Sequence, residues 1–175
     1  MSAVSVRLPD GKRLEFPEGA TVLEVAQRIG PGLAKAALAG RIDGDLVDLR
    51  KPLRGDVALE IVTAKDPAGG EVIRHSAEHV MADAVKRLFP NAQVDAGRSD
   101  HSEKFQYDFL VENAFTPEDI EKIEQEMASI LAESKPFERQ VVTRGEAEKL
   151  FASMGEQLKL SRLADIPADA EITVF

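Results

Sequence analysis

Residues 4–24 read VSVRLPDGKRLEFPEGATVLE, and this stretch decides the fold of the first part of the chain. The runs VSVRL and RLEF alternate apolar and polar side chains, as half-buried strands do. The PDGK segment between them has the composition of a tight turn, so the two runs predict a β-hairpin. Thr21 and Glu24 then have the spacing of a capping box, which predicts that a helix begins there.

The segments that follow extend this hairpin into a small mixed domain. The predicted helix has apolar side chains at helical spacing and ends at Gly30-Pro31-Gly32. Three more strands are expected, separated by turns that contain glycine: residues 37–42, 46–47 and 57–62. A helix lying across a mixed sheet buries one face of each element. Residues 1–62 therefore predict a ubiquitin-like β-grasp domain.

A second domain is expected after a short linker. Residues 63–70, TAKDPAGG, are small, polar and interrupted by Pro and Gly, so we interpret them as the linker. Residues 71–175 predict an α+β domain with long helices packed on an antiparallel sheet, and Thr116 and Thr143 have the capping sequences of two of its helices. The expected strands are residues 105–109, 137–142, 158–160 and 171–175. The last strand ends with the segment, which indicates a truncated domain.

Composition excludes several classes of function. The 175 residues contain no cysteine, which excludes disulfides, thiolate metal ligands and a cysteine nucleophile within them. The formal net charge is −9, and all of it arises after residue 62. Such an acidic segment cannot neutralise phosphates alone, so a nucleic-acid partner would be held mainly by other parts of the protein. The sequence has no signal-peptide pattern and no run of about 20 apolar residues, so we expect a cytoplasmic protein that does not contact membranes.

The segment RHSAEHV, residues 74–80, carries two of the three histidines. On a helix His75 and His79 lie on one face, and at about 100° per residue that face is nearly opposite the apolar stripe between Ile73 and Leu88. Three interpretations remain open: a metal site, acid–base chemistry, or a structural pair without function. Zinc is the weakest of these, because no third ligand is evident. An imidazole titrates near neutral pH and could position or deprotonate water.

Two further side chains have simpler interpretations. His101 lies in the polar loop of residues 97–104 with no partner at the spacing of metal ligands, so we expect a solvated loop histidine. Tyr107 lies in an alternating run and is expected to pack.

Three motifs in the first domain resemble a TGS domain, a β-grasp module shared by threonyl-tRNA synthetases, certain GTPases and stringent-response enzymes. They are LPDG at 8–11, GATV at 19–22 and DGDLVDL at 43–49. These motifs define the fold far better than the function. We therefore interpret Gly44 and Asp45 as turn residues rather than ligand contacts.

The second domain resembles the editing domain of bacterial threonyl-tRNA synthetases. The matching motifs are HSAEHVMADAV (75–85), LFPNA (88–92), YDF (107–109), FTPED (115–119), PFER (136–139) and GE (155–156) followed by LKL (158–160). In that family this domain hydrolyses serine wrongly attached to the tRNA for threonine. The resemblance assigns His75 and His79 to the hydrolytic site, where imidazoles could position water and the terminal ribose hydroxyls. It assigns Lys159 to the same pocket, where its charge could favour negative charge on the ester oxygen.

The resemblance also implies features outside this segment. The parent enzyme would be a homodimer that attaches threonine to its tRNA, with ATP, magnesium and zinc bound in a catalytic domain that is absent here. No cofactor or metal site is expected within residues 1–175. The family's second half-motif, Cys-x-x-x-His, is also absent, so the segment is expected to supply half a site and to be nearly inactive alone. The loop at 97–104 differs from the family's shorter, apolar version. The alternatives are a non-catalytic module that binds tRNA or protein and a free-standing editing relative.

Overall fold

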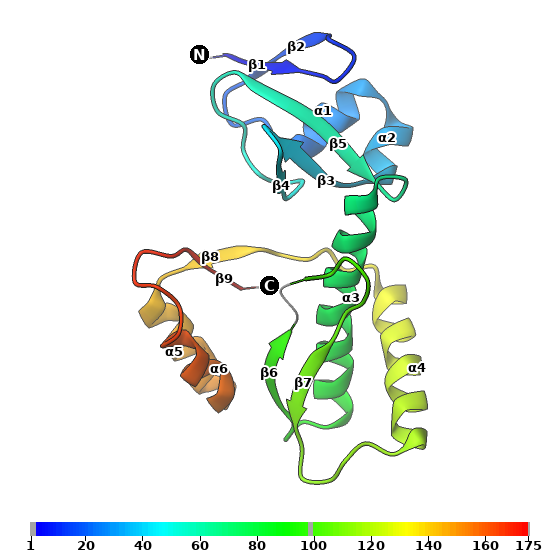
Figure 1. Cartoon of the computed structure of the whole chain (residues 1–175), viewed down its shortest axis with the longest axis vertical. Helices are drawn as coiled ribbons and strands as arrows, with labels where there is room; N and C mark the ends of the chain where they lie inside the picture. The colour runs from blue at the N-terminus through cyan, green and yellow to red at the C-terminus, as the bar shows by residue number, and fades with distance from the viewer. Residues whose placement is uncertain (1–2, 98–99, 175) are drawn as a thin grey trace. The chain divides into compact units, whose positions relative to one another are not determined.

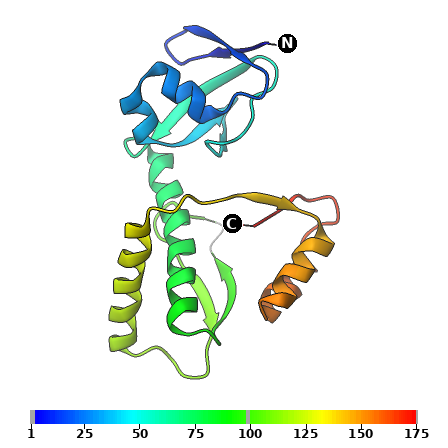
Figure 2. The ribbon, with the colours of Figure 1, turned by 180° about the vertical axis from the view of Figure 1, so that it is seen from behind.

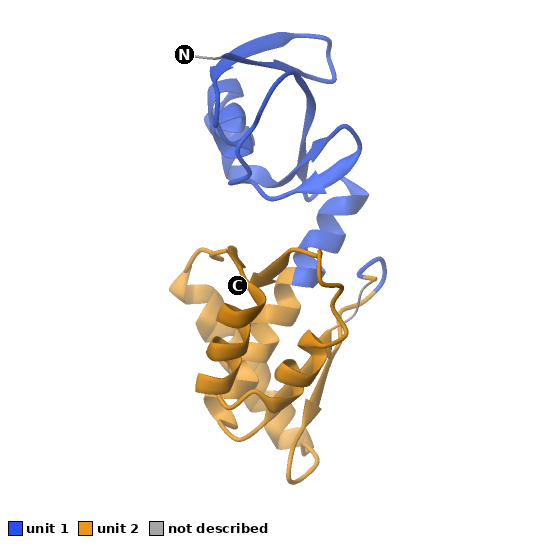
Figure 3. Ribbon diagram, turned by 90° about the vertical axis from the view of Figure 1, so that its left-hand side faces the viewer, with its two compact units in different colours: residues 1–75, 101–103 blue, residues 76–100, 104–175 orange. Residues whose placement is uncertain are grey.

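The computed structural model describes residues 3–97 and 100–174, which form two compact units (Figure 3). Unit 1 comprises residues 1–75 and 101–103, and unit 2 comprises residues 76–100 and 104–175. Arg98 and Ser99 of the polar loop, and Phe175 of the last expected strand, lie outside the described residues.

Unit 1 is a mixed five-stranded sheet with strand order β2-β1-β5-β3-β4. Its elements are β1 (Ala3–Arg7), β2 (Arg13–Pro17), α1 (Val22–Ile29), α2 (Pro31–Ala36), β3 (Ala37–Ile42), β4 (Asp45–Val47) and β5 (Val57–Thr63). Strands β1 and β2 form the predicted hairpin, with Ser5 opposite Glu15, and β1 is parallel to β5. The two helices lie on one face of the sheet (Figure 2). This arrangement is the predicted β-grasp fold.

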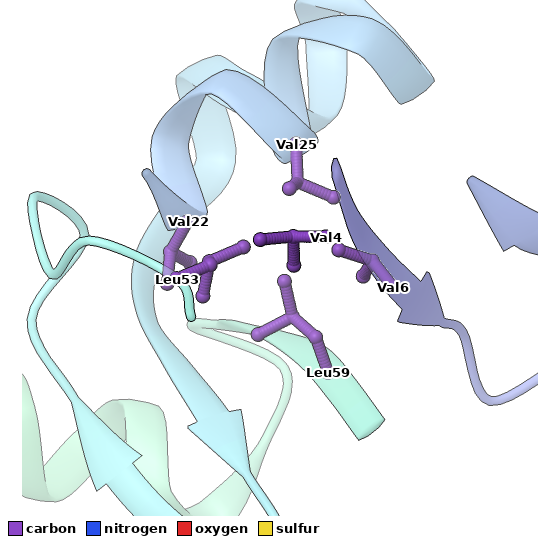
Figure 4. Packing of buried hydrophobic residues seen from close by; sticks show 6 residues of the cluster. All are labelled: Val4, Val6, Val22, Val25, Leu53 and Leu59. Atoms are coloured by element: carbon purple, nitrogen blue, oxygen red, sulfur yellow. The ribbon is translucent and has the colours of Figure 1, made fainter. Parts of the chain in front are cut away.

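The core of unit 1 lies between α1 and the sheet (Figure 4). Alternation along β1 directs Val4 and Val6 to the same face, where they meet Val22 and Val25 of α1, and all four are fully buried. Each such side chain contributes about 1.5–3 kcal/mol through burial. The predicted capping box begins α1: the hydroxyl of Thr21 accepts a hydrogen bond from the backbone N–H of residue 24 at 3.3 Å.

Helix α2 was not expected, because Gly30-Pro31-Gly32 was interpreted as the end of a helix. Helix α1 does end at Ile29, but Pro31 occupies the first turn of α2, where its missing N–H costs nothing. The same proline therefore both follows one helix and begins the next.

Helix α3 spans Pro67–Leu88, so the second half of the predicted linker at 63–70 is helical. Two physical features allow a helix to begin there. Asp66 accepts a hydrogen bond from the N–H of Ala68 at 2.8 Å, and Pro67 is compatible with a first turn. A Cβ atom at Gly69 would lie 2.1 Å from the carbonyl oxygen of Thr63, so glycine allows the helix to pass close to the end of β5.

Unit 2 contains the rest of α3, α4 (Pro117–Glu133), α5 (Arg144–Ser153) and α6 (Gln157–Leu163). It also contains β6 (Gln93–Gly97), β7 (Tyr107–Leu110), β8 (Gln140–Val142) and β9 (Ile172–Val174). The α+β class is confirmed, and the described strands form two antiparallel pairs, β6-β7 and β8-β9. Helices α3 and α4 run side by side (Figures 1 and 2). The predicted capping boxes at Thr116 and Thr143 are present.

Two elements of unit 2 differ from the sequence prediction. Residues 158–160 were expected to form a strand but belong to α6, because Leu160 and Leu163 pack at helical spacing against α5 and β9. Strand β6 lies in a stretch expected to be irregular, and Val94 in its centre is buried. Both stretches are too short for the spacing of their apolar residues to distinguish strand from helix or loop.

Buried apolar residues of unit 2 form two separate groups. The first joins α3 to α4 and contains Ala84, Val85, Ala92 and Ile123. The second joins α5, α6 and β9 and contains Ala147, Leu163 and Ile172. The apolar stripe predicted for α3 is buried at its centre, whereas Ile73 and Leu88 at its ends are exposed.

Candidate functional site

Helix α3 carries both candidate histidines, His75 in unit 1 and His79 in unit 2. His75 is exposed, and its ring contacts that of His101, with centroids 4.7 Å apart and planes inclined by 40°. The guanidinium group of Arg74 donates hydrogen bonds to the carbonyl oxygens of His101 and Ser102, the latter at 2.7 Å. The start of α3 therefore holds this part of the loop.

The prediction that His101 is a solvated loop histidine is wrong. Only 9% of His101 is exposed, because the two hydrogen bonds from Arg74 fix its backbone and the ring packs on His75. Spacing along the sequence could not reveal this contact, since 26 residues separate the two histidines.

His79 is partly buried and lies 6.0 Å from the ring of Phe137, measured between centroids. It lines a pocket of about 340 Å³ between α3 and the chain around the end of α4. An ion pair of Arg87 and Glu133, 2.6 Å apart, lies along the same pocket. Hydrogen bonds from Arg87 and Lys135 lower the pKa of Glu133 to about 2. The pocket thus combines an apolar wall with one imidazole and a fixed pair of charges.

Lys159 lies on α6 and is partly buried, with its Nζ atom 5.7 Å from the ring centroid of Phe151. Burial lowers the pKa of Lys159 because it disfavours the charged ammonium group. The charge of Glu156 acts in the opposite direction, and the charge of Lys86 lowers the pKa further. A lysine in this setting is unlike the ordinary exposed residue that its place between two leucines suggests.

Glu156 was not a candidate from the sequence, although it lies in the matched GE motif. It is 1% exposed, and its carboxylate accepts hydrogen bonds from the backbone N–H of Val94 at 3.2 Å and from Nζ of Lys86 at 2.8 Å. Lys86 also donates to the carbonyl oxygens of Pro90 and Ala92. A glutamate after a glycine has the sequence appearance of a surface residue, so only the structure reveals its burial.

Tyr107 packs as expected, half-buried, with its ring centroid 5.8 Å from that of Phe109. Burial raises the pKa of Tyr107, and the charges of Glu78 and Glu156 raise it further. Glu78 is itself buried, and its carboxylate accepts a hydrogen bond from the N–H of Gln106 at 2.9 Å. Two buried carboxylates therefore act in the same direction on the pKa of one phenol.

The structure brings Lys159 together with Glu156, Lys86 and Phe151, and none of these described neighbours is a histidine. The ring contact of His79 is with Phe137 instead. Over residues 3–97 and 100–174, no three His, Asp or Glu side chains gather closely enough to hold a metal ion. None of the helices described is long and apolar enough to cross a membrane.

The fold and the sequence of unit 1 together define the domain family to which it belongs. Residues 4–63 match the TGS domain family, so the β-grasp of unit 1 is a TGS domain.

Comparison over the whole chain gives a more specific result than the TGS domain alone. It is 50% identical over 172 residues to the threonine–tRNA ligase of Cupriavidus pinatubonensis, an alignment that covers 98% of the chain and 27% of the relative. The enzyme of the same name from Pelobacter propionicus is 48% identical over 169 residues, covering 97% and 26%. That from Symbiobacterium thermophilum is 47% identical over 174 residues, covering 99% and 27%.

The chain thus spans about a quarter of the length of the curated relatives that it matches. The resemblance predicted from the motifs is confirmed. Over nearly its whole length, the chain is similar to the amino-terminal region of bacterial threonine–tRNA ligases.

Proposed function

We propose that this chain is part of an enzyme that attaches threonine to its tRNA, and that it contributes to hydrolysis of serine wrongly attached to that tRNA. The observation that carries the proposal is the 47–50% identity to threonine–tRNA ligases, which extends across both units. The aligned length of 174 residues includes the segment with both histidines and the segment with Lys159.

Discrimination between the two amino acids explains why such an enzyme needs a hydrolytic site. Serine differs from threonine by one missing methyl group, which is worth only about 1–3 kcal/mol in a binding pocket. Selection by binding alone would therefore charge too much serine. A second site that hydrolyses the wrong ester removes the error.

The candidate residues suit ester hydrolysis. The imidazoles of His75 and His79 can position or deprotonate a water molecule near neutral pH. An ammonium group such as that of Lys159 stabilises the negative charge that develops on the ester oxygen in the transition state, and partial burial strengthens that interaction. The lysine must then stay protonated despite its lowered pKa.

Other parts of the proposal concern the rest of the enzyme. ATP, magnesium and zinc would serve the ligation reaction in a catalytic domain outside this segment. The partner would be tRNA, held mainly by that larger body because residues 1–175 are acidic. The second half of the editing motif, Cys-x-x-x-His, would also lie outside it, and the working enzyme would be a homodimer.

Deacylation of seryl-tRNA tests the proposal. In a protein that carries this segment and has the length of the relatives, His75→Ala is expected to abolish deacylation of seryl-tRNA and to leave threonine charging intact. Loss of charging instead would show that His75 has another role. The 175-residue chain alone is expected to deacylate little or no seryl-tRNA. Rapid turnover by it would contradict the prediction that it supplies only half of the hydrolytic site.

A second candidate function is binding by unit 1 without catalysis. A groove of about 650 Å³ on this unit is the feature that favours it. Arg7 and Arg41 line this groove together with Asp43 and Glu60, and Arg41 is paired with Glu60. If binding is the function, the 175-residue chain should bind the tRNA for threonine, and Arg7→Gln should weaken that binding. Binding that is unaffected by this substitution would argue against the groove.

A further inference from the structure

We infer that Glu156 is a positioning residue for Lys159, which it places by anchoring the start of α6 to β6 and α3. From this place its charge also acts on the ammonium group of Lys159. The role of Lys159 in this inference rests on the proposed function. The anchoring and the control of charge are properties of the chain itself, and they can be measured without any reaction.

The first observation is the burial of Glu156 at the start of α6. Its carboxylate reaches Val94 in the centre of β6 and Lys86 on α3, so three elements meet at one side chain. An ionised carboxylate in this place needs both partners, because an unpaired buried charge is strongly disfavoured. The pair therefore fixes where α6 begins.

The second observation is that polar contacts connect α6 to β6. The N–H of Gln157 donates to Oε1 of Gln93 at 2.9 Å, and the guanidinium group of Arg162 donates to both carboxylate oxygens of Asp95 at 2.8 and 3.0 Å. The buried apolar group of α6 is separate from that of α3 and α4. The position of Lys159 relative to β6 and α3 thus depends on polar contacts, and among those described here that of Glu156 is buried.

The third observation is the charge around Lys159. Glu156 precedes it by three residues, about one helical turn, and Lys86 of α3, which pairs with Glu156 at 2.8 Å, acts on it through its charge. Glu78 of α3 and Glu156 also act together on Tyr107 of β7. Burial and Lys86 both favour the neutral amine, whereas Glu156 favours the ammonium form. Glu156 is therefore the group that opposes deprotonation of Lys159.

Titration of lysine side chains in the 175-residue chain tests the control of charge. Lysines carrying ¹³C-labelled methyl groups are followed by NMR as the pH rises, and the signal of Lys159 is the one lost in Lys159→Arg. Glu156→Gln should lower the measured pKa of Lys159, and Lys86→Gln should raise it. The exposed residue Glu148, changed to Gln, is the matched control and should shift nothing. The absence of shifts of opposite sign would overturn the inference.

The double variant Glu156→Gln, Lys86→Gln keeps the test decisive if a single variant unfolds. It replaces the ion pair by two neutral amides, and its circular dichroism should match that of the parent chain. The pKa of Lys159 in it should lie above that in Glu156→Gln and below that in Lys86→Gln, so one folded single variant is enough for the comparison. A value on the other side of that single variant would contradict additive control by the two charges.

Activity in a protein of the relatives' length separates this inference from the proposed function. Lys159→Met should slow deacylation of seryl-tRNA about 100-fold. Glu156→Gln should lower kcat with little change in KM and shift the alkaline limb of the pH–rate profile to lower pH. Full activity of Lys159→Met would overturn the role of Lys159 in the proposed function even if the titration behaves as expected. An unchanged titration would overturn the inference whatever the activity.

Discussion

The two units hold their elements together in different ways. In unit 1 one sheet and one helix share a single apolar core, centred on residues such as Val4, Val25 and Leu59. In unit 2 the apolar residues divide into two groups, and buried polar contacts around Glu156 and Lys86 connect the elements that carry them. The comparison teaches that Lys159 lies where packing is least continuous, so that charge and hydrogen bonding help to determine its position.

Truncation of one leucine in each unit measures this difference directly. Leu59→Ala should destabilise unit 1 by about 2–5 kcal/mol, because Leu59 is surrounded by one large core. Leu163→Ala should fall at the lower end of that range, since the group around it contains only two other buried residues. Hydrogen exchange of amides in β1 and β9 reports the two effects separately. Equal costs would show that the two cores are equally well packed.

A pair of glycines tests the close passage of α3 along β5. Gly69→Ala should destabilise the chain by about 1–3 kcal/mol, because its new methyl group would meet the carbonyl oxygen of Thr63. Gly145→Ala in α5 is the control, since nothing lies within 4 Å of its added Cβ, and it should be neutral or stabilising. Thermal unfolding followed by circular dichroism gives both values. A harmless Gly69→Ala would mean that α3 begins elsewhere.

Capping boxes begin helices in both units, and removing one should have a smaller effect on the free energy of unfolding. Thr21→Ala and Thr116→Ala should each cost about 1 kcal/mol, because each removes the acceptor for the N–H of the third helical residue. Urea unfolding measures the cost. The two variants should weaken different units, α1 in the first case and α4 in the second. Equal destabilisation of both units by either variant would contradict this expectation.

The pH dependence of unit 2 gives the smallest effect. The pKa of Glu133 is lowered from 4.5 to about 2, so its pairing with Arg87 stabilises the folded state above pH 4.5. That contribution is lost as the pH falls toward 2. The melting temperature of Glu133→Gln should therefore depend less on pH in this interval than that of the parent chain. Glu124→Gln, at an exposed position of α4, should not change the slope.

The fold of unit 1 could be predicted because local signals and packing agree there. The hairpin, the capping box at Thr21 and the strands all coincide with the burial of alternating residues. The helical start of α3 within residues 63–70 could not be predicted, because Pro67 and Gly69 have roles in a helix start that their composition does not reveal. The strand predicted at residues 158–160 was wrong, because three residues are too few to show the period of a strand or a helix.

The candidate site was predictable only in part. The positions of His75 and His79 on one helix follow from their spacing of four residues. The burial of Glu156 and the contact of His101 with His75 depend on chain segments far apart in the sequence, so no local pattern contains them. Lys159 became a candidate only through the resemblance, and its lowered pKa arises mainly from burial, to which the charge of Lys86 on α3 adds.

The strand order of unit 1 has a consequence for synthesis on the ribosome. Strand β5 is the last strand of this unit to emerge, yet it lies between β1 and β3. Until residues 57–63 are available, β1 and β3 each expose an unpaired edge, to which another chain can add. The nascent chain therefore cannot complete this sheet stepwise; it closes in one late event, when its central strand is inserted.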